Sequence, residues 1–108
     1  MPSPEAPTAP SNIDDDLDPI VHSPARLKIL TVLKEVDSAD FLFILRQTGL
    51  TRGNLSSHLS KLETTGYVTI TKEFVDKIPH TLIQLTEEGK QALQIYRQQM
   101  LQKLDLIK

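Results

Sequence analysis

The 108-residue chain has no cysteine, only 4 glycines and no long apolar run. Without cysteine it forms no disulfide, thiolate metal site or iron–sulfur centre, and it has no thiol for redox sensing. A membrane helix needs about 20 consecutive apolar residues, and a secretory signal needs a basic segment followed by an apolar stretch. Because both patterns are missing, we expect a single-domain cytoplasmic protein with a small core and no membrane contact.

Lysine and arginine are missing from the first part of the chain. Residues 1–18 hold five acidic residues and four prolines, with almost no large apolar side chains. Such a segment cannot offset its ordering entropy, so we predict a disordered, acidic, proline-rich arm over residues 1–18, with Met1–Asp16 as its core. The whole chain has 12 basic and 14 acidic residues. Setting the arm aside leaves 12 basic against 9 acidic residues over 19–108, a net charge of +3 that suits a polyanionic partner.

Two helices are indicated after the arm. Ser23 followed by proline is typical of a helix start, and leucines at helical spacing predict a helix over Pro24–Glu35. Either Ser38 or Asp40 could cap a second helix. The run Phe41–Leu45 is apolar on nearly every side, which predicts a short helix buried between other elements.

A third helix is predicted from Thr51 to Thr65, after Gly49 ends the second helix and before Gly66 closes the third. Its apolar residues are spaced four and three apart, so they form one narrow stripe. These residues are Leu55, Leu59 and Leu62. The opposite face is small and polar. Two helices with so short a connection form a helix-turn-helix, whose second helix could enter a DNA major groove.

The apolar period then changes to two. Residues 67–75 and 81–85 alternate as strands, and the segment 76–80 between them has loop character, which together predict a β-hairpin over 67–85 with a basic tip. Thr86 caps a last helix, with two glutamates in its first turn where the helix dipole favours anions. We expect this helix to continue to Lys108.

The third helix and the hairpin carry the candidate DNA contacts. A helix that reads base edges must be slim and must offer hydrogen-bonding groups. Gly53 removes a Cβ at the approach surface, Arg52 can pair with guanine O6 and N7, and Asn54 can pair with an adenine edge. Cations of the hairpin are placed to meet the DNA backbone or the minor groove. The predicted DNA-binding residues are Thr51, Arg52, Gly53, Asn54, Ser56, Ser57, His58, Ser60, Lys61, Lys72, Lys77 and His80.

Each of these features also has an ordinary structural interpretation. The serines and Lys61 could simply face solvent, and His58, at the edge of the leucine stripe, favours packing or a phosphate contact over metal binding. A glycine inside a helix lowers helix stability by about 1 kcal/mol relative to alanine, so tolerance alone is a weak explanation for Gly53. The three histidines lie in separate elements, so we predict no metal site and no cofactor. The order and lengths of all the elements together favour DNA binding.

Five stretches of the sequence resemble the short winged-helix transcriptional regulators, the stand-alone winged-helix subgroup related to the MarR and ArsR regulators. They are residues 22–30, 40–45, 50–63, 66–68 and 85–89, of which 50–63 is the most specific. The resemblance covers about residues 19–100. It implies a winged-helix fold, a homodimer, and operator binding through the helix at 51–65 with the hairpin as a wing. It implies neither a target gene nor a ligand.

The chain departs from the family pattern in two places. The cysteine-containing metal-sensor motif of many ArsR-type proteins is absent, so thiolate metal sensing does not carry over. Many winged helices hold arginine near the wing tip, whereas this hairpin offers Lys77 and His80. We therefore expect wing contacts that are weaker or sensitive to pH.

The last helix carries an apolar stripe that runs nearly to the end of the chain. An apolar stripe on a protruding helix must find a partner, which favours pairing with a second copy over folding back on its own core. A two-fold dimer would place its recognition helices about 34 Å apart, in successive major grooves. The predicted dimerisation residues are Leu93, Tyr96, Met100, Leu101, Leu104 and Ile107.

The sequence thus predicts an α+β, mostly helical protein, a winged helix-turn-helix with a long C-terminal dimerisation helix. A DNA-binding domain over 19–85 follows the arm at 1–18, and the dimerisation helix spans 86–108. The predicted function is that of a dimeric, sequence-specific regulator that binds double-stranded DNA. The alternative is a winged-helix protein-interaction module with little DNA affinity. No enzyme motif is present, and a cleft beside the last helix could hold an unidentified small-molecule effector.

Overall fold

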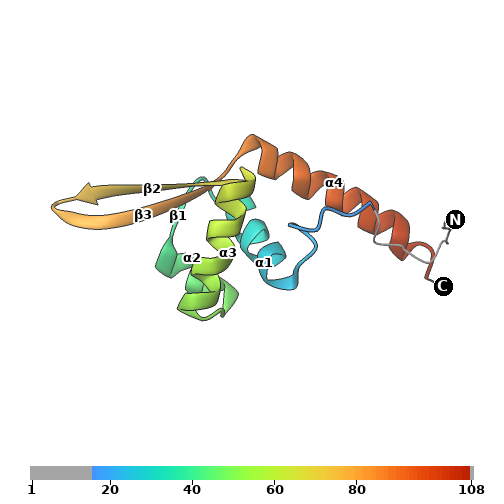
Figure 1. The fold of residues 1–108 in the computed structure, drawn as a ribbon, viewed down its shortest axis with the longest axis horizontal. Coiled ribbons are helices and arrows are strands. Elements are labelled where there is room, and N and C mark those ends of the chain that lie inside the picture. The colour runs from blue at the N-terminus through green and yellow to red at the C-terminus, as the bar shows by residue number, and fades with distance from the viewer. Residues whose placement is uncertain (1–15, 108) are drawn as a thin grey trace, which may run out of the picture.

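The computed structural model describes residues 16–107. Its elements are α1 (Pro24–Lys34), β1 (Ala39–Asp40), α2 (Phe41–Thr48), α3 (Arg52–Thr65), β2 (Val68–Val75), β3 (Ile78–Leu85) and α4 (Glu87–Leu104). The predicted mostly helical winged-helix architecture is confirmed, with an antiparallel sheet in the order β1-β3-β2. Figure 1 shows the β2–β3 hairpin and α4 projecting in opposite directions from a body formed by the other helices. No helix in the described range is both long and apolar enough to cross a bilayer.

Local sequence signals set the ends of the helices. The residue before each helix accepts, through its side chain, a hydrogen bond from a backbone N–H of the first turn. The four caps are Ser23 with Arg26 at 3.3 Å, Asp40 with Phe43 at 2.8 Å, Thr51 with Asn54 at 3.2 Å, and Thr86 with Gly89 at 3.0 Å. Asp40, not Ser38, is therefore the cap of α2. Gly49 and Gly66 end α2 and α3 in the left-handed conformation, as predicted, with φ of 72° and 90°.

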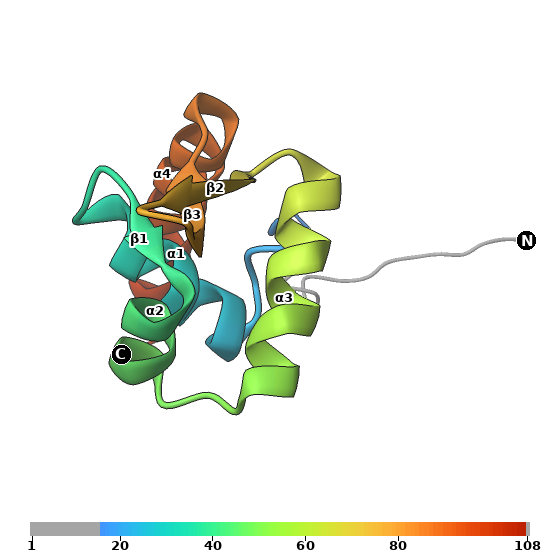
Figure 2. The same cartoon turned by 90° about the vertical axis from the view of Figure 1, so that its left-hand side faces the viewer.

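The core lies where α1, α3 and the base of the sheet meet. The predicted leucine stripe of α3 is buried there, against apolar residues of α1 and two residues from the hairpin. The largest fully buried side chains of these elements are Ile29, Leu30, Leu33, Leu55, Leu62, Val68 and Ile83. Because the stripe occupies one side of α3, the other side of the helix stays outside this core. Figure 2 shows α3 forming one side of the molecule.

The second strand of the hairpin is longer, and its turn is tighter, than the sequence predicts. The expected loop over 76–80 is wrong, because only Asp76 and Lys77 form the turn, both with positive φ, at 52° and 67°. Positive φ at both central residues is the type I′ geometry, whose twist matches that of the paired strands. Pro79 is accommodated in β3 because β1 pairs only with residues 82–83, which leaves the outer part of that edge without a partner strand. His80 therefore lies within a strand and not at the tip.

The second helical region departs from prediction in two ways. Strand β1 was not predicted, because two residues carry no alternating pattern and their pairing partners, Leu82 and Ile83, lie far along the chain. Helix α2 is not buried on all sides. Ile44 is fully buried, whereas Leu42 and Phe43 are partly exposed. A short apolar helix at the edge of a small domain has too few neighbours to cover its whole circumference.

The predicted arm ends earlier than residue 18. Residues 1–15 lie outside the described residues, but Leu17 is buried in the core and Val21 is fully buried. Asp18 accepts hydrogen bonds from the Tyr67 hydroxyl and from the backbone N–H of Ile20. Composition averaged over a segment does not detect that a single leucine at its end is buried, which is why the boundary was misplaced. Helix α4 likewise ends at Leu104, before the predicted end at residue 108, which itself lies outside the described residues.

Candidate nucleic-acid interface

The outward side of α3 is polar and exposed. We call this surface the polar face of α3, and it consists of Arg52, Gly53, Asn54, Ser56, Ser57, Ser60 and Lys61. Within residues 16–107 their side chains form no hydrogen bond or ion pair, and only backbone atoms of Asn54 and Lys61 bond to neighbouring threonine hydroxyls. The acidic residue of α3, Glu63, lies towards the opposite end of the helix from Arg52. The end of α3 that carries Arg52 therefore offers donors, a cation and the positive end of the helix dipole.

Among the described residues, none packs against the position where a Gly53 side chain would lie. A Cβ built at Gly53 would meet nothing within 4 Å, and its φ is not in the left-handed region. Glycine inside a helix costs about 1 kcal/mol relative to alanine, so a glycine that neither the backbone nor the packing requires favours a close approach from outside. Gly89 is the opposite case, because its Cβ would lie 2.3 Å from the backbone oxygen of Tyr67.

Two predicted DNA-binding residues of this region already have structural partners. The Thr51 hydroxyl is the N-cap of α3. His58 is half-buried, and its Nδ1 lies 3.2 Å from Nη1 of Arg26. Since arginine can only donate, Nδ1 of His58 accepts this hydrogen bond. The structure thus agrees with the packed interpretation of His58 considered from the sequence.

Arg26 is a positioning residue that the sequence analysis missed. Besides contacting His58 on α3, its Nε donates to the carbonyl of Ile20 at 2.6 Å and its Nη2 to the carbonyl of Pro19 at 3.4 Å. One guanidinium therefore links α1, α3 and the segment that precedes α1. The five donors of arginine make such a link possible, but the sequence gives no signal of which carbonyls it will reach.

The wing holds its predicted cations in different environments. Lys72 is exposed on β2, Lys77 is exposed at the turn, and His80 is half-buried on β3 opposite Glu73. Only the two lysines are thus fully available at the surface. The sequence analysis also missed that the strand ends next to the turn are apolar and exposed, above all Phe74.

The predicted dimerisation stripe of α4 divides into two parts. Tyr96 is only 7% exposed and its hydroxyl lies 2.8 Å from Nδ1 of His22, so this residue belongs to the core of its own chain. Leu93 and Met100 also pack partly against that core. For these three residues the fold-back alternative describes the structure, because the helix crosses its own domain at that level. The last three members of the stripe, Leu101, Leu104 and Ile107, are exposed.

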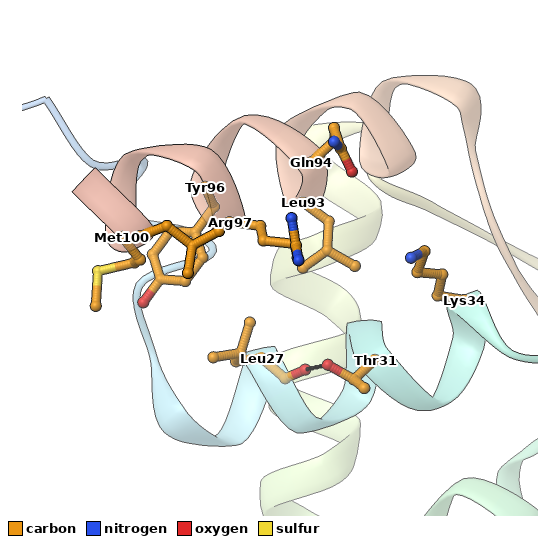
Figure 3. A pocket seen from close by; sticks show the side chains of 9 residues that line it. Leu27, Thr31, Lys34, Leu93, Gln94, Tyr96, Arg97 and Met100 are labelled. Atoms are coloured by element: carbon orange, nitrogen blue, oxygen red, sulfur yellow. Dashed lines mark hydrogen bonds between the residues drawn. The ribbon is translucent and has the colours of Figure 1, made fainter. Parts of the chain in front are cut away.

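A groove of about 410 Å³ runs between α1 and α4 (Figure 3). Leu27 on one side faces Leu93 and Met100 on the other, and Lys34 and Arg97 provide cations at the groove. This is the position where the sequence analysis expected a cleft. Its apolar lining adjoins the exposed part of the α4 stripe through Leu101.

The segment before α1 contacts α4 and the turn between α3 and β2 through two acidic residues. Asp16 forms an ion pair with Nζ of Lys103 at 2.6 Å, and the hydrogen bond with Lys103 lowers the pKa of Asp16. The hydrogen bond that Tyr67 donates to Asp18, together with burial, raises the pKa of Tyr67 to about 12. Over residues 16–107 no three His, Cys, Asp or Glu side chains gather into a group that could hold a metal ion.

A helix-turn-helix with an open polar second helix, followed by a projecting hairpin, defines a winged-helix DNA-binding protein. A family model described as "winged helix DNA-binding domain" matches residues 25–104. The chain belongs to this winged-helix DNA-binding domain family, and its fold is that of the MarR-type transcriptional regulators.

Three similar proteins show how far the likeness extends. An uncharacterized protein of Methanocaldococcus jannaschii is 35% identical over 83 residues, which are 77% of this chain and 90% of that protein. A transcriptional regulator homologue from Pyrococcus horikoshii is 29% identical with a TM-score of 0.80, over 89% of this chain and 93% of its own. A mutant of MarR from Escherichia coli in complex with operator DNA is 22% identical with a TM-score of 0.70, over 86% and 66% of the two chains.

Proposed function

We propose that this protein is a dimeric, sequence-specific DNA-binding regulator of transcription. In this proposal α3 enters the major groove and the β2–β3 hairpin lies beside it as a wing. The observation that carries the proposal is the polar face of α3, which is exposed and holds no side-chain partner within the described chain. The MarR relative in complex with operator DNA has the same fold, which supports double-stranded DNA as the partner.

Residues at the start of α3 would read the sequence. Arg52 can form two hydrogen bonds with guanine O6 and N7, and Asn54 can pair with adenine N6 and N7. Gly53 lies between them and lets the backbone approach the duplex. The serines, with Lys61, would contact phosphates or base edges, and Lys72 and Lys77 would contact the backbone from the wing. His80, half-buried opposite Glu73, has the least access of the predicted set.

A second copy of the chain is the proposed partner of α4. Leu104 is 50% exposed and Ile107 is 70% exposed, which is costly for large apolar side chains on a small protein. The groove between α1 and α4 joins the same exposed stripe through Leu101 and would be covered in the same interface. Tyr96 lines the same groove but is already buried by its own chain, so it would add little further area to this interface.

The test is a fluorescence-anisotropy titration of the full chain. Duplexes selected from a random library, and unselected random duplex, are compared at low and moderate salt. We expect salt-dependent binding to both, with much tighter binding to the selected duplex. The variant Arg52→Ala/Lys61→Ala should weaken binding to the selected duplex. The control Lys28→Ala/Lys90→Ala removes two positive charges at exposed positions of α1 and α4, outside the polar face of α3 and outside the groove between α1 and α4. It should leave binding to the selected duplex nearly unchanged, and sedimentation verifies that the oligomeric state is unaltered.

The alternative function is a protein-interaction module with little DNA affinity. The observation that favours it is the apolar surface of α2, where Leu42 and Phe43 are partly exposed. This alternative predicts no binding of random duplex even at low salt, whereas the DNA-binding proposal predicts measurable binding there. If the double variant bound the selected duplex as tightly as the unaltered protein, the polar face of α3 would not be the reading surface.

Two finer parts of the proposal concern location and regulation. Cytoplasmic location stays a prediction from the sequence. A small-molecule effector also stays a prediction, and the groove between α1 and α4 is where we would look for it. Competition between an effector and the second copy for this groove would link ligand binding to dimerisation, and hence to DNA binding.

A further inference from the structure

The tip of the wing is apolar on both of its faces. Two cross-strand pairs flank the turn, Val75 with Ile78 and Phe74 with Pro79. Such pairs stabilise a hairpin by covering one another. Phe74 nevertheless stays 75% exposed and Ile78 59% exposed, so the pairing leaves most of this apolar surface open. Hairpin stability alone therefore does not account for an aromatic ring at this position.

Strand alternation separates the charges of the wing between its two faces. Lys72 and Phe74 share the face that continues inward to Val68, which is buried in the core. Glu73 points to the other face, together with Val75. At the turn, Asp76 and Lys77 cancel in formal charge. The face that carries the aromatic ring thus carries a cation and no carboxylate, which suits an apolar contact made within a polyanion.

The wing also has the reach for such a contact. From Ile70, which packs against the core, to Val75 the hairpin extends about 17 Å at roughly 3.4 Å per residue. The minor groove of B-DNA is about 6 Å wide and about 7.5 Å deep. Two strands lie about 4.8 Å apart before their side chains are counted. A tip with side chains on both faces therefore fits only if the groove widens.

We propose that the wing tip is an apolar wedge for the DNA minor groove. Phe74, supported by Pro79 across the hairpin, inserts at one base step and partly unstacks it, while Lys72 on the same face contacts the adjacent phosphates. Unstacking is least costly at flexible pyrimidine–purine steps, so the wing would select such a step by its deformability without pairing with base edges. This inference rests on the proposed DNA-binding function. It adds that the bound DNA is bent and that the deformability of one base step contributes to sequence specificity.

The test uses the full chain and a duplex selected with it from a random library. 2-Aminopurine is placed in turn at each step flanking the α3 site, and the bend is measured by energy transfer between dyes at the duplex ends. We expect emission to rise several-fold at one step, together with a bend towards the major groove. Phe74→Ala should abolish both signals and weaken binding to the selected duplex by about tenfold. Phe74→Leu, which keeps an apolar wedge, should retain most of both.

Thr71→Val is the matched control, because it changes an exposed residue of the same strand on the opposite face and away from the tip, and keeps a β-branched strand former. It should leave emission and bend unchanged. NMR spectra of the backbone amides verify that β2 and β3 still pair in each variant. If Phe74→Ala bound the duplex with unchanged emission and bend, or if no step responded to the unaltered protein, the wedge would be wrong while DNA binding stood. If the full chain bound no duplex, the proposed function would fail together with the wedge.

Discussion

Helices α3 and α4 are both capped by threonine and both bury one side, yet they leave opposite kinds of surface open. α3 covers its leucine stripe with its own domain and exposes polar side chains. α4 buries Tyr96 but leaves Leu101 and Leu104 exposed. Since water already solvates a polar surface, α3 is stable without a partner and can bind one reversibly. An open apolar stripe gains free energy only when it is covered, which indicates a lasting partner for α4.

The largest expected effect is on the buried side of α3. Leu55→Ala should lower the free energy of unfolding by about 2–5 kcal/mol, because it removes a fully buried side chain and leaves a cavity. Ser56→Ala, next to it on the polar face of α3, should change stability by less than about 0.5 kcal/mol. Urea unfolding at fixed protein concentration measures both. Equal effects at the two positions would break the distinction between the two sides of α3.

The open stripe of α4 is tested by adding charge to it. Leu101→Glu/Leu104→Glu should convert the proposed dimer into a monomer, because the two carboxylates would have to be buried without partners at the interface. Gln98→Glu/Gln102→Glu adds the same charge at exposed polar positions of the same helix and should leave the dimer intact. Analytical ultracentrifugation over a range of concentrations gives the outcome. A dimer that survived the leucine variant would require an interface elsewhere.

Two residues on the polar face of α3 should contribute differently to DNA affinity, Arg52 by recognising a base and Lys61 by contacting phosphate. Arg52→Ala should weaken binding to the selected duplex by about 1–3 kcal/mol and relax the preference at one base position. Lys61→Ala should weaken binding to all duplexes alike and lower the salt slope by about 1. Anisotropy titrations against single-base variants of the duplex measure both. If the two variants lost affinity in the same pattern, Arg52 would be a phosphate contact rather than a base contact.

How much of this arrangement the sequence predicts depends on how local each feature is. The caps of α3 and α4, the glycines that end α2 and α3, and the leucine stripe follow from residues within a few positions of one another, and these predictions are confirmed. β1 could not be predicted, because its pairing with Ile83 is distant in sequence. The burial of Tyr96 depends on how α4 crosses its own domain, which helical periodicity does not define.

The candidate site divides in the same way. The spacing of residues along α3 predicts which side chains share a face, and the structure places that face outward. Which of the predicted site residues already have a hydrogen-bond partner depends on residues distant in the sequence. His58, for example, is bonded to Arg26 on α1. The prediction of a basic wing tip rested on Lys77 and His80, whereas His80 lies within β3 and the exposed side chains beside the turn are mainly apolar.

The hydrogen bond between the turn after α3 and the segment before α1 gives a pH-dependent prediction of moderate size. The hydrogen bond from Tyr67 to Asp18 requires the protonated phenol, so Tyr67→Phe should cost about 1 kcal/mol of stability at neutral pH. Its pKa is raised from 10.0 to about 12 in the folded state. The contribution is therefore complete below pH 10 and is lost as the pH rises through about 12.

Unfolding measured on both sides of this range checks the prediction. The unaltered protein should lose stability over the range in which the Tyr67→Phe variant does not, so the two curves should converge as the pH approaches the upper value. Tyr96→Phe is a control that removes a different buried hydroxyl. A constant difference between the Tyr67 variant and the unaltered protein at every pH would mean that the phenol proton does not hold this link.

The smallest expected effect on stability is at Gly53 in α3, and it should be opposite in sign to the effect at Gly89 in α4. Gly53→Ala should raise the free energy of unfolding by up to about 1 kcal/mol, because alanine favours the helix and a Cβ meets nothing at this position. The same variant should weaken binding to the selected duplex, since the added methyl group lies on the approach surface. Gly89→Ala should instead destabilise the fold, because its Cβ would collide with the backbone of Tyr67. If Gly53→Ala gained stability and kept full DNA affinity, the helix would not approach the duplex along this side.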